Sequence, residues 1–400
     1  GRGHSVRVLG DPTLEPEARA VGCEFSAWTT APHRTSRDPS HDVFKDYEFK
    51  NPLKMMDAYL RLFLAEPAPR WARDTAAELE ARPVDVLVVD FAIPAALIPG
   101  EKLKLPMATL MPNIWIIPTP GIPPMGPGLM PAKGWPGRLR DALMLKLTNK
   151  LFGRALPPLN AVRESFGLAK VSSTYDQFLA AQVILVQTSP TFDFTSPAIP
   201  KHVRYVGPEL VDPEWSEPWR SPFATNDQRP LVLVGLGSSF QNQAPLLRRI
   251  VAGLSRLPVR AVLTLGPALK PADVSGADNV VVVQSAPHAQ VLKEASLLIT
   301  HCGHGTTMKG LAAGVPLVCI PMGRDQNDTA ARVVHCGAGL RLKPNASAHQ
   351  IGAAVDRILR QTSYRTAATK MARLIASREG CADPVECLER LCSSKNRVAA

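Results

Sequence analysis

Short apolar runs alternate with segments of helical periodicity through the second half of the chain. Continuous apolar runs of about four to eight residues are typical of buried parallel strands, and apolar residues that recur every three or four positions are typical of helices. Their alternation predicts a doubly wound parallel sheet of the α/β class. The runs expected as strands are LVLVGLG (231–237), AVLTLG (261–266), NVVVVQ (279–284), SLLIT (296–300) and PLVCIP (316–321), and the clearest expected helix covers 244–257.

The first half shows the same alternation less regularly. Between Met111 and Pro136 the periodicity stops, and Pro, Gly, Met and Trp residues crowd together. A long irregular apolar segment inside a compact domain is commonly a binding loop. The basic residues from Lys133 to Lys150 are interrupted by apolar ones, and we interpret that stretch as a solvated surface. Strands are expected at 5–10, 85–91, 105–112 and 183–188, and helices at 14–21 and 55–82.

The length of the chain predicts two domains, because 400 residues exceed what one hydrophobic core usually organises. The segment from Gly207 to Pro230 is rich in proline, tryptophan and acidic residues, which is typical of an interdomain linker. We therefore expect a first domain at 1–206, a second at 231–377, and a C-terminal helix at 378–400 that packs back on the first domain.

Composition limits the expected binding partners and the expected cellular compartment of the protein. The formal net charge is +11, but the basic residues are scattered and form no stripe with interleaved aromatic residues, so nucleic acid is not an expected partner. No apolar run reaches the ~18 residues of a membrane-spanning helix. The seven cysteines contain no Cys-x-x-Cys pair, which favours reduced thiols and a cytoplasmic protein. The oligomeric state does not follow from these patterns.

One turn, ITHCGHGTTMKGLAAGVP at 299–316, concentrates chemistry between an expected strand and an expected helix. We expect the helix to begin at a Thr306 or Thr307 N-cap. The free N–H groups of a helix start attract anions, and glycines without a Cβ let a phosphate approach the backbone. Ligands of open α/β sheets lie at the carboxyl ends of strands, where this turn lies. The turn therefore predicts a phosphate cradle.

Two other interpretations of the turn stay open. His301, Cys302 and His304 are metal-ligating residue types, but they fall in one turn and no distant pair completes a zinc spacing, so no metal is expected. A purely structural turn without a ligand is also compatible with the glycines.

The run from Gln284 to Val333 resembles the donor-binding signature of nucleotide-sugar-dependent glycosyltransferases with two Rossmann-like domains, the GT-B fold. It is most similar to the macrolide-type bacterial branch of the UDP-glycosyltransferase superfamily, which glycosylates small natural products. The residues that carry the resemblance are Ala286-Pro287-His288, Gly314-Val315-Pro316, Pro321 and Asp325-Gln326.

The resemblance implies a binding role for each part of the signature. Ser285 and Lys309 stand where plant members carry Trp and Glu, which removes the base stack, alters the ribose contact and leaves uridine and thymidine donors open. The implied donor residues are His301, Gly303, Gly305 and Thr306 for the diphosphate, Asp325 and Gln326 for the hydroxyls of the transferred sugar, the backbone around Ala286 and His288 for the base edge, and Ser238 and Ser239 for closure over phosphates and sugar.

The implied reaction is inverting transfer of a sugar from a nucleoside diphosphate sugar to a hydroxyl of a small apolar natural product of macrolide, polyketide or flavonoid type. A base removes the hydroxyl proton, and the oxygen attacks the anomeric carbon opposite the diphosphate. The helix start and His301 would stabilise the leaving diphosphate. No Asp-x-Asp triplet occurs, so transfer without a metal or other cofactor is expected. The acceptor is expected against residues 91–98 and 115–130.

Asp90, at the end of an expected strand, matches the family's aspartate that orients the catalytic histidine. By the same resemblance, the first strand and the loop that carries this histidine would precede Gly1, so we expect a first domain without its first strand. A turn or capping role for Asp90 stays open. His33 and His41 are the alternative bases.

Three other functions stay in consideration. A nucleotide-sugar-binding protein without activity would follow from the missing base histidine. A nucleotide-sugar epimerase has the same two-domain shape, but it has no lipophilic acceptor to explain the apolar segment 111–136. A dinucleotide oxidoreductase is disfavoured because Gly235-Leu236-Gly237-Ser238-Ser239 lacks the third glycine of that fingerprint.

Overall fold

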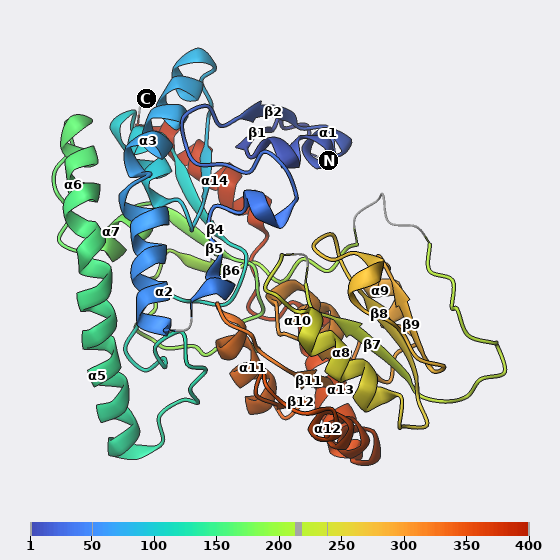
Figure 1. The fold of residues 1–400 in the computed structure, drawn as a ribbon. Coiled ribbons are helices and arrows are strands. Elements are labelled where there is room, and N and C mark those ends of the chain that lie inside the picture. The colour runs from blue at the N-terminus through green and yellow to red at the C-terminus, as the bar shows by residue number, and fades with distance from the viewer. Residues whose placement is uncertain (1, 50, 213–217, 238, 399–400) are drawn as a thin grey trace.

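The computed structural model describes residues 2–49, 51–212, 218–237 and 239–398, which form two α/β domains side by side (Figure 1). The C-terminal domain is built on a six-stranded sheet in the order β12-β11-β10-β7-β8-β9, in which every pair of neighbours is parallel. The α/β class and the parallel sheet expected from the sequence are confirmed. The strands are β7 (Leu231–Gly235), β8 (Arg260–Thr264), β9 (Val280–Val283), β10 (Leu297–Thr300), β11 (Leu317–Cys319) and β12 (Gly339–Arg341).

Alternate residues of the central strands enter two different apolar cores, which explains their uninterrupted apolar sequence. On β7, Val232 and Val234 face the core that contains α8 and α12, whereas Leu231 and Leu233 face the core that contains α10 and α13. Helices therefore cover both faces of the sheet, as in doubly wound folds. The helices of this domain are α8 (Ala244–Leu254), α9 (His288–Val291), α10 (His304–Ala312), α11 (Gln326–His335), α12 (Ala348–Arg360) and α13 (Thr362–Ser377).

The N-terminal domain contains two separate parallel sheets, a pair β1-β2 and a four-stranded sheet β3-β4-β5-β6. In the part of the chain that the structure describes, no ladder joins β1 to β3, and Val88 in the middle of β3 is 42% exposed. The sheet of this domain is thus divided between its second and third described strands. The strands are β1 (Arg7–Gly10), β2 (Glu24–Ala27), β3 (Leu87–Asp90), β4 (Met107–Met111), β5 (Val183–Val186) and β6 (Val203–Tyr205).

The helices of the N-terminal domain include several that were not expected. The expected helical region 55–82 divides into α2, a π-helical segment at Leu60–Ala65 and α3. Helix α5 occupies the stretch that the sequence analysis interpreted as a solvated surface. No helix was expected there because Gly134, Pro136 and Gly137 at its start disfavour helix. The helices are α1 (Glu15–Ala20), α2 (Pro52–Tyr59), α3 (Ala68–Ala81), α4 (Leu97–Lys102), α5 (Gly134–Phe152), α6 (Leu156–Ser165) and α7 (Thr174–Phe178).

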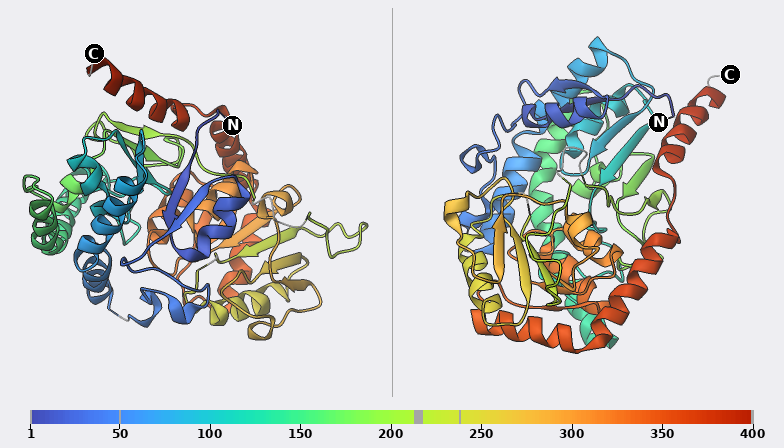
Figure 2. Two further views of the ribbon diagram at one scale, coloured as in Figure 1. Left: turned by 90° about the horizontal axis from the view of Figure 1, so that it is seen from above. Right: turned by 90° about the vertical axis from the view of Figure 1, so that its right-hand side faces the viewer.

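The last helix, α14 (Pro384–Val398), leaves the C-terminal domain and returns to the N-terminal one (Figure 2). Leu388 joins a small core with Ala108 of β4, and Arg2 near the start of the chain forms ion pairs with Asp383 and Glu389. No helix in the described residues is both long and apolar enough to span a membrane.

Candidate functional site

The turn after β10 presents the start of α10 at the carboxyl edge of the sheet. The N-cap of α10 is Gly303, so the prediction of a Thr306 or Thr307 N-cap is wrong. Cys302 adopts a left-handed φ of 69° and turns the chain early, and the N–H of Thr307 already donates to the Gly303 carbonyl at 3.0 Å. Within the described residues, the N–H groups of Gly305 and Thr306 meet no acceptor. Free N–H groups at a helix start suit an anion.

The glycines of this turn have different roles. A Cβ on Gly303 would lie 2.8 Å from Cε1 of His301, and a Cβ on Gly237, after β7, would lie 2.7 Å from the same atom. The His301 ring therefore lies between the two turns, and both glycines make room for it. A Cβ on Gly305 would meet no atom within 4 Å, and this residue is exposed. Gly305 is thus the glycine that leaves the helix start open to a ligand.

His301 is buried and uncharged, with 6% of its surface exposed. Burial, together with the nearby Arg324 guanidinium, lowers the pKa of His301 to about 4, although a hydrogen bond to the Gly235 backbone opposes the shift. Near neutral pH the ring is therefore a neutral hydrogen-bonding group. It supplies no full positive charge to a phosphate.

Asp325 and Gln326 lie at the start of α11, and only Asp325 is free for a ligand. The Gln326 amide oxygen accepts from the Met322 N–H at 2.8 Å, and the amide nitrogen donates to Gln241 Oε1 at 2.6 Å. Because Gln326 is 2% exposed and held in this way, it orders the loop before α11. No side chain in the described residues bonds the Asp325 carboxylate, and burial raises its pKa.

The N-terminal domain reaches the same loop through Asp46. Its carboxylate accepts from Arg324 Nε at 2.7 Å and from Arg324 Nη2 at 3.0 Å, and it also accepts from Gln241 at 3.3 Å. Next to it, the rings of Tyr47 and Phe240 meet edge to face with centroids 4.8 Å apart. These contacts hold the two domains together beside Asp325.

The predicted contacts to the sugar and base fall on two other turns. Ser238 lies outside the described residues, and Ser239 is half-buried with its carbonyl bonded to Gln243 at 3.3 Å. Ala286 and His288 lie at the start of α9. His288 Nε2 contacts Thr264 Oγ1 at 3.0 Å, and burial lowers its pKa to about 4. The imidazole thus faces the sheet, and the backbone of the turn remains for a base edge.

Lys309 contacts an acid that was not expected from the sequence. Its Nζ forms an ion pair with Asp212, at the end of the described part of the linker. The second oxygen of Asp212 accepts from the N–H of Ala289 on α9 at 2.8 Å. The linker carboxylate of Asp212 therefore lies beside Lys309, the residue at which the resemblance implies an altered ribose contact.

Asp90 ends β3, and its carboxylate accepts from the N–H of Ala92 at 2.8 Å. Desolvation by its surroundings raises the pKa of Asp90, and burial and the Asp90 charge together raise the pKa of Tyr59 to about 12. None of the nine histidines of the chain, all of them in the described residues, bonds to Asp90. His33 and His41 contact residues of their own loop instead. Asp90 therefore makes a turn contact, which is the structural role that the sequence analysis left open for it.

An aromatic cluster, not expected from the sequence, includes the Tyr59 ring beside Asp90. The Phe44 ring lies with its centroid 5.6 Å from Phe49, 6.0 Å from Tyr59 and 5.8 Å from Phe63, and the last two rings stack at 5.2 Å. These rings are half-buried, and Phe49 is 37% exposed. Partly open aromatic faces suit an apolar ligand.

The apolar segment expected to line the acceptor site packs instead against the C-terminal domain. Asp328 of α11 accepts from the N–H groups of Gly126 and Gly128 at 2.7 and 3.1 Å. The cavity between the segment and α11 is about 10 Å³ as it stands, smaller than a drug-sized ligand. The expectation that residues 115–130 line the acceptor site stays a prediction. The buried side chains of the segment are Ile114, Trp115, Ile117 and Ile122.

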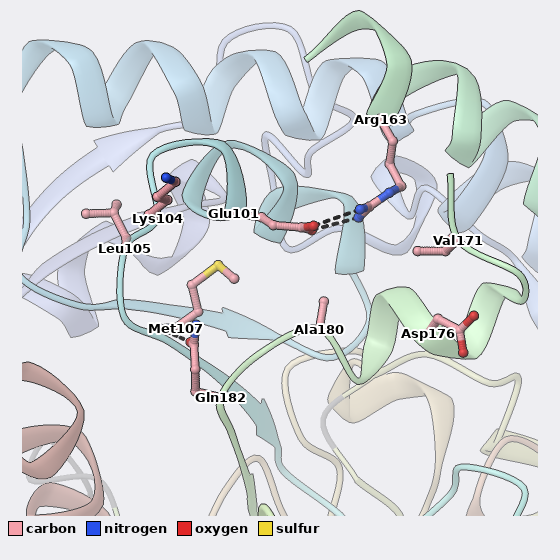
Figure 3. A pocket seen from close by; sticks show the side chains of 9 residues that line it. All are labelled: Glu101, Lys104, Leu105, Met107, Arg163, Val171, Asp176, Ala180 and Gln182. Carbon is pink, nitrogen blue, oxygen red and sulfur yellow. Dashed lines mark hydrogen bonds and ion pairs between the residues drawn. The ribbon is translucent and has the colours of Figure 1, made fainter. Parts of the chain in front are cut away.

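A cavity of about 420 Å³ lies at the opposite, amino edge of the N-terminal sheet, beside Met107 at the start of β4 (Figure 3). Three of its charged groups already have partners: Arg163 forms a double ion pair with Glu101, both bonds at 2.7 Å, and Asp176 caps α7. The ion pair between Arg163 and Glu101 thus joins α6 to α4 at this cavity. In the described residues, no group of three or more His, Cys, Asp or Glu side chains is arranged to hold a metal ion.

Three buried histidines predict destabilisation in acid. Burial lowers the pKa of His288, His301 and His304 to about 4, from an ordinary value of 6.5. Between these values the unfolded chain binds more protons than the folded chain, so stability falls as the pH falls. At pH 5 each histidine costs about 2 kcal/mol relative to neutral pH. Asp328 opposes the trend, because burial raises its pKa to about 6.

We therefore expect the free energy of unfolding, measured with urea, to fall between pH 7.5 and pH 5. His304 Nε2 bonds the Gln187 carbonyl at 3.0 Å. Substituting Gln for His304 should reduce the slope of the unfolding free energy against pH by the equivalent of about one bound proton. An unfolding free energy that is the same at both pH values would contradict the burial of these rings.

The C-terminal domain and the whole chain are each similar to known proteins. A family model described as "Erythromycin biosynthesis protein CIII-like, C-terminal domain" matches residues 248–392. The chain is 28% identical over 397 residues to 4'-demethylrebeccamycin synthase of Lentzea aerocolonigenes, a match that covers 98% of this chain and 93% of the relative. These similarities show that the chain is a glycosyltransferase of the natural-product type.

Solved structures show that this glycosyltransferase has the GT-B fold. The calicheamicin glycosyltransferase CalG4 superposes with a TM-score of 0.74 at 21% identity and covers 100% of this chain and 93% of that one. The spinosyn rhamnosyltransferase SpnG, complexed with thymidine diphosphate, superposes with a TM-score of 0.62 at 20% identity, covering 94% of this chain and 89% of that one. The resemblance to the macrolide-type branch is confirmed.

Proposed function

We propose that this glycosyltransferase moves a sugar from a UDP- or dTDP-sugar to a hydroxyl of a small apolar natural product, with inversion at the anomeric carbon. The observation that carries the proposal is the open start of α10 at Gly305 and Thr306, in the same donor-domain turn region as the unpaired carboxylate of Asp325. The names of the rebeccamycin and calicheamicin proteins and the thymidine diphosphate complex support it.

The donor diphosphate would bind the free N–H groups of Gly305 and Thr306. These donors are fixed before the reaction and meet the charge that grows on the leaving diphosphate, so they favour the transition state. His301 would add a neutral hydrogen bond. We propose that transfer needs no metal, because the helix start supplies the positive potential at the diphosphate.

Asp325 would bond hydroxyls of the transferred sugar, and Gln326 would hold the loop that positions Asp325. The linker carboxylate of Asp212 would stand near the ribose, and the backbone at Ala286 and His288 near the base. A carboxylate distinguishes sugars by accepting hydrogen bonds from their hydroxyls.

The acceptor would bind against the aromatic cluster, with its hydroxyl directed to Asp90. By the resemblance, Asp90 would orient the base that takes up the acceptor's proton as the oxygen attacks. We also propose a cytoplasmic location, since the seven cysteines contain no Cys-x-x-Cys pair and are typical of reduced thiols.

Replacing Asp325 with Ala tests the assignment of the sugar contact. Loss of hydrogen bonds to a charged group should lower kcat/KM for transfer roughly 10- to 100-fold. The Kd of the free nucleoside diphosphate, measured by calorimetry, should stay within about twofold, because that ligand has no sugar. Asn327→Ala is the matched control, since Asn327 lies two residues after Asp325 and its side chain bonds Arg341. Equal losses for the nucleoside diphosphate and the nucleotide sugar would refute a sugar-specific role, and no transfer from any nucleotide sugar by the unmodified chain would refute the proposed function.

A further inference from the structure

The outer side of α5 carries a row of exposed apolar side chains. Trp135, Leu139, Leu143 and Leu147 are 70%, 52%, 58% and 48% exposed. Because side chains four residues apart lie on the same side of a helix, these four form one continuous row, called here the α5 stripe. In Figures 1 and 2, α5 lies at the outer margin of the N-terminal domain. Folded monomers rarely expose a contiguous apolar patch without a use for it.

Basic residues accompany the α5 stripe. With about 3.6 residues in each turn, Lys146 falls between Trp135 and Leu139 around the helix, and Lys150 falls between Leu139 and Leu143. Lysine and leucine therefore share one face. The single acid of the helix, Asp141, lies away from this face and is paired with Arg140 at 2.7 Å. The exposed face thus carries positive charge that no acid of the helix neutralises.

This combination selects one kind of partner. A second copy of the chain would bring lysines against lysines, with no acid on the exposed face of either helix to pair them. An anionic lipid surface accommodates both residue types, since leucines enter the boundary between headgroups and acyl chains while the flexible lysines keep their charges at the phosphates. The net charge of +11 adds long-range attraction to such a surface.

We propose that the α5 stripe binds the surface of anionic membranes, with α5 lying in the plane of the interface. The stripe lies outside the donor turns, so this binding does not depend on the proposed transfer reaction. It gives the enzyme a place at the surface where apolar molecules accumulate.

Sedimentation with lipid vesicles tests the proposal on the full chain. We expect binding to vesicles of phosphatidylcholine with phosphatidylglycerol, weaker binding to phosphatidylcholine alone, and a loss of binding as NaCl is raised. The double substitution Leu139→Gln/Leu143→Gln should lower the partition coefficient at least tenfold. The double substitution Lys146→Gln/Lys150→Gln should lower it about tenfold for the anionic vesicles and little for the neutral ones.

A matched control is Val21→Gln, which removes an apolar side chain that is 70% exposed on another part of the surface. This variant should bind vesicles like the unmodified chain. All these positions are on the surface, so the fold should persist, and circular dichroism checks it. Failure of the unmodified chain to bind anionic vesicles, or equal binding by all variants, would overturn the proposal. A dimer in light scattering that dissociates on Leu139→Gln/Leu143→Gln, without vesicle binding, would show that a second copy covers the stripe instead.

Discussion

Gly305→Asp is expected to lower the affinity for a nucleoside diphosphate at least 100-fold without harming the fold. Gly305 is the second residue of α10, it is exposed, and a Cβ there meets no atom within 4 Å. A new carboxylate at this point would occupy the place of the phosphate and repel it, and like charges in contact cost several kcal/mol. The same carboxylate suits the first turn of a helix, where it stabilises by about 0.3–1 kcal/mol.

The binding measurement for this variant is calorimetry with UDP and thymidine diphosphate, and thermal unfolding checks the fold. Gly305→Ala is the control, since its methyl group enters open space and removes glycine's conformational freedom. We expect this control to bind nearly as the unmodified chain does and to gain about 0.5–1 kcal/mol of stability. A Gly305→Asp variant that keeps its diphosphate affinity would show that the start of α10 is not the phosphate site.

Arg332→Met is expected to destabilise the protein by about 3–5 kcal/mol, because it leaves a carboxylate buried without its cation. Arg332 on α11 donates through Nε to Asp193 of the N-terminal domain at 2.7 Å, and the two side chains are 4% and 0% exposed. Asp193 also accepts from the Trp115 N–H and the Tyr205 hydroxyl. The guanidinium lies over the Phe194 ring, 4.2 Å from its centroid.

Chemical unfolding followed by tryptophan fluorescence and circular dichroism measures this loss. The double substitution Arg332→Met/Asp193→Asn should recover at least half of it, since the amide oxygen can still accept one of the remaining bonds and no charge is stranded. A single variant within about 1 kcal/mol of the unmodified chain would contradict the importance of this pair for the domain interface.

Sequence patterns correctly predicted the elements whose own apolar side chains indicate how they are buried. The strands β7, β8 and β10 read as continuous apolar runs because helices bury both faces of the sheet. The start of α10 was placed too late, since hydroxyl residues are the usual N-caps, whereas here the left-handed Cys302 lets Gly303 take that position. Helix α5 was missed because Gly134, Pro136 and Gly137 at its start disfavour helix, although the leucines and lysines that follow favour it.

The donor signature could be located from the sequence, but its internal geometry could not. Gly303 was expected to face a phosphate, and it instead makes room for the His301 ring. Gln326 was expected to face the sugar, but its side chain instead bonds its own loop and Gln241. Such contacts join residues far apart in the chain.

The contacts between the domains are also long-range. Asp46 and Arg324 are 278 residues apart, and Asp193 and Arg332 are 139 apart. No local periodicity carries that information. The acceptor side follows the same rule, because the aromatic cluster joins Phe44 of one loop to Tyr59 and Phe63 of the following helical segment.

A crystal structure of the chain with UDP tests the donor site most directly. We expect the diphosphate at the start of α10, with phosphate oxygens about 3 Å from the backbone nitrogens of Gly305 and Thr306. The uracil should lie at the turn before α9, and the carboxylate of Asp325 should remain open for a sugar. A diphosphate bound away from α10, or in the cavity beside Arg163, would contradict the donor site proposed for this enzyme.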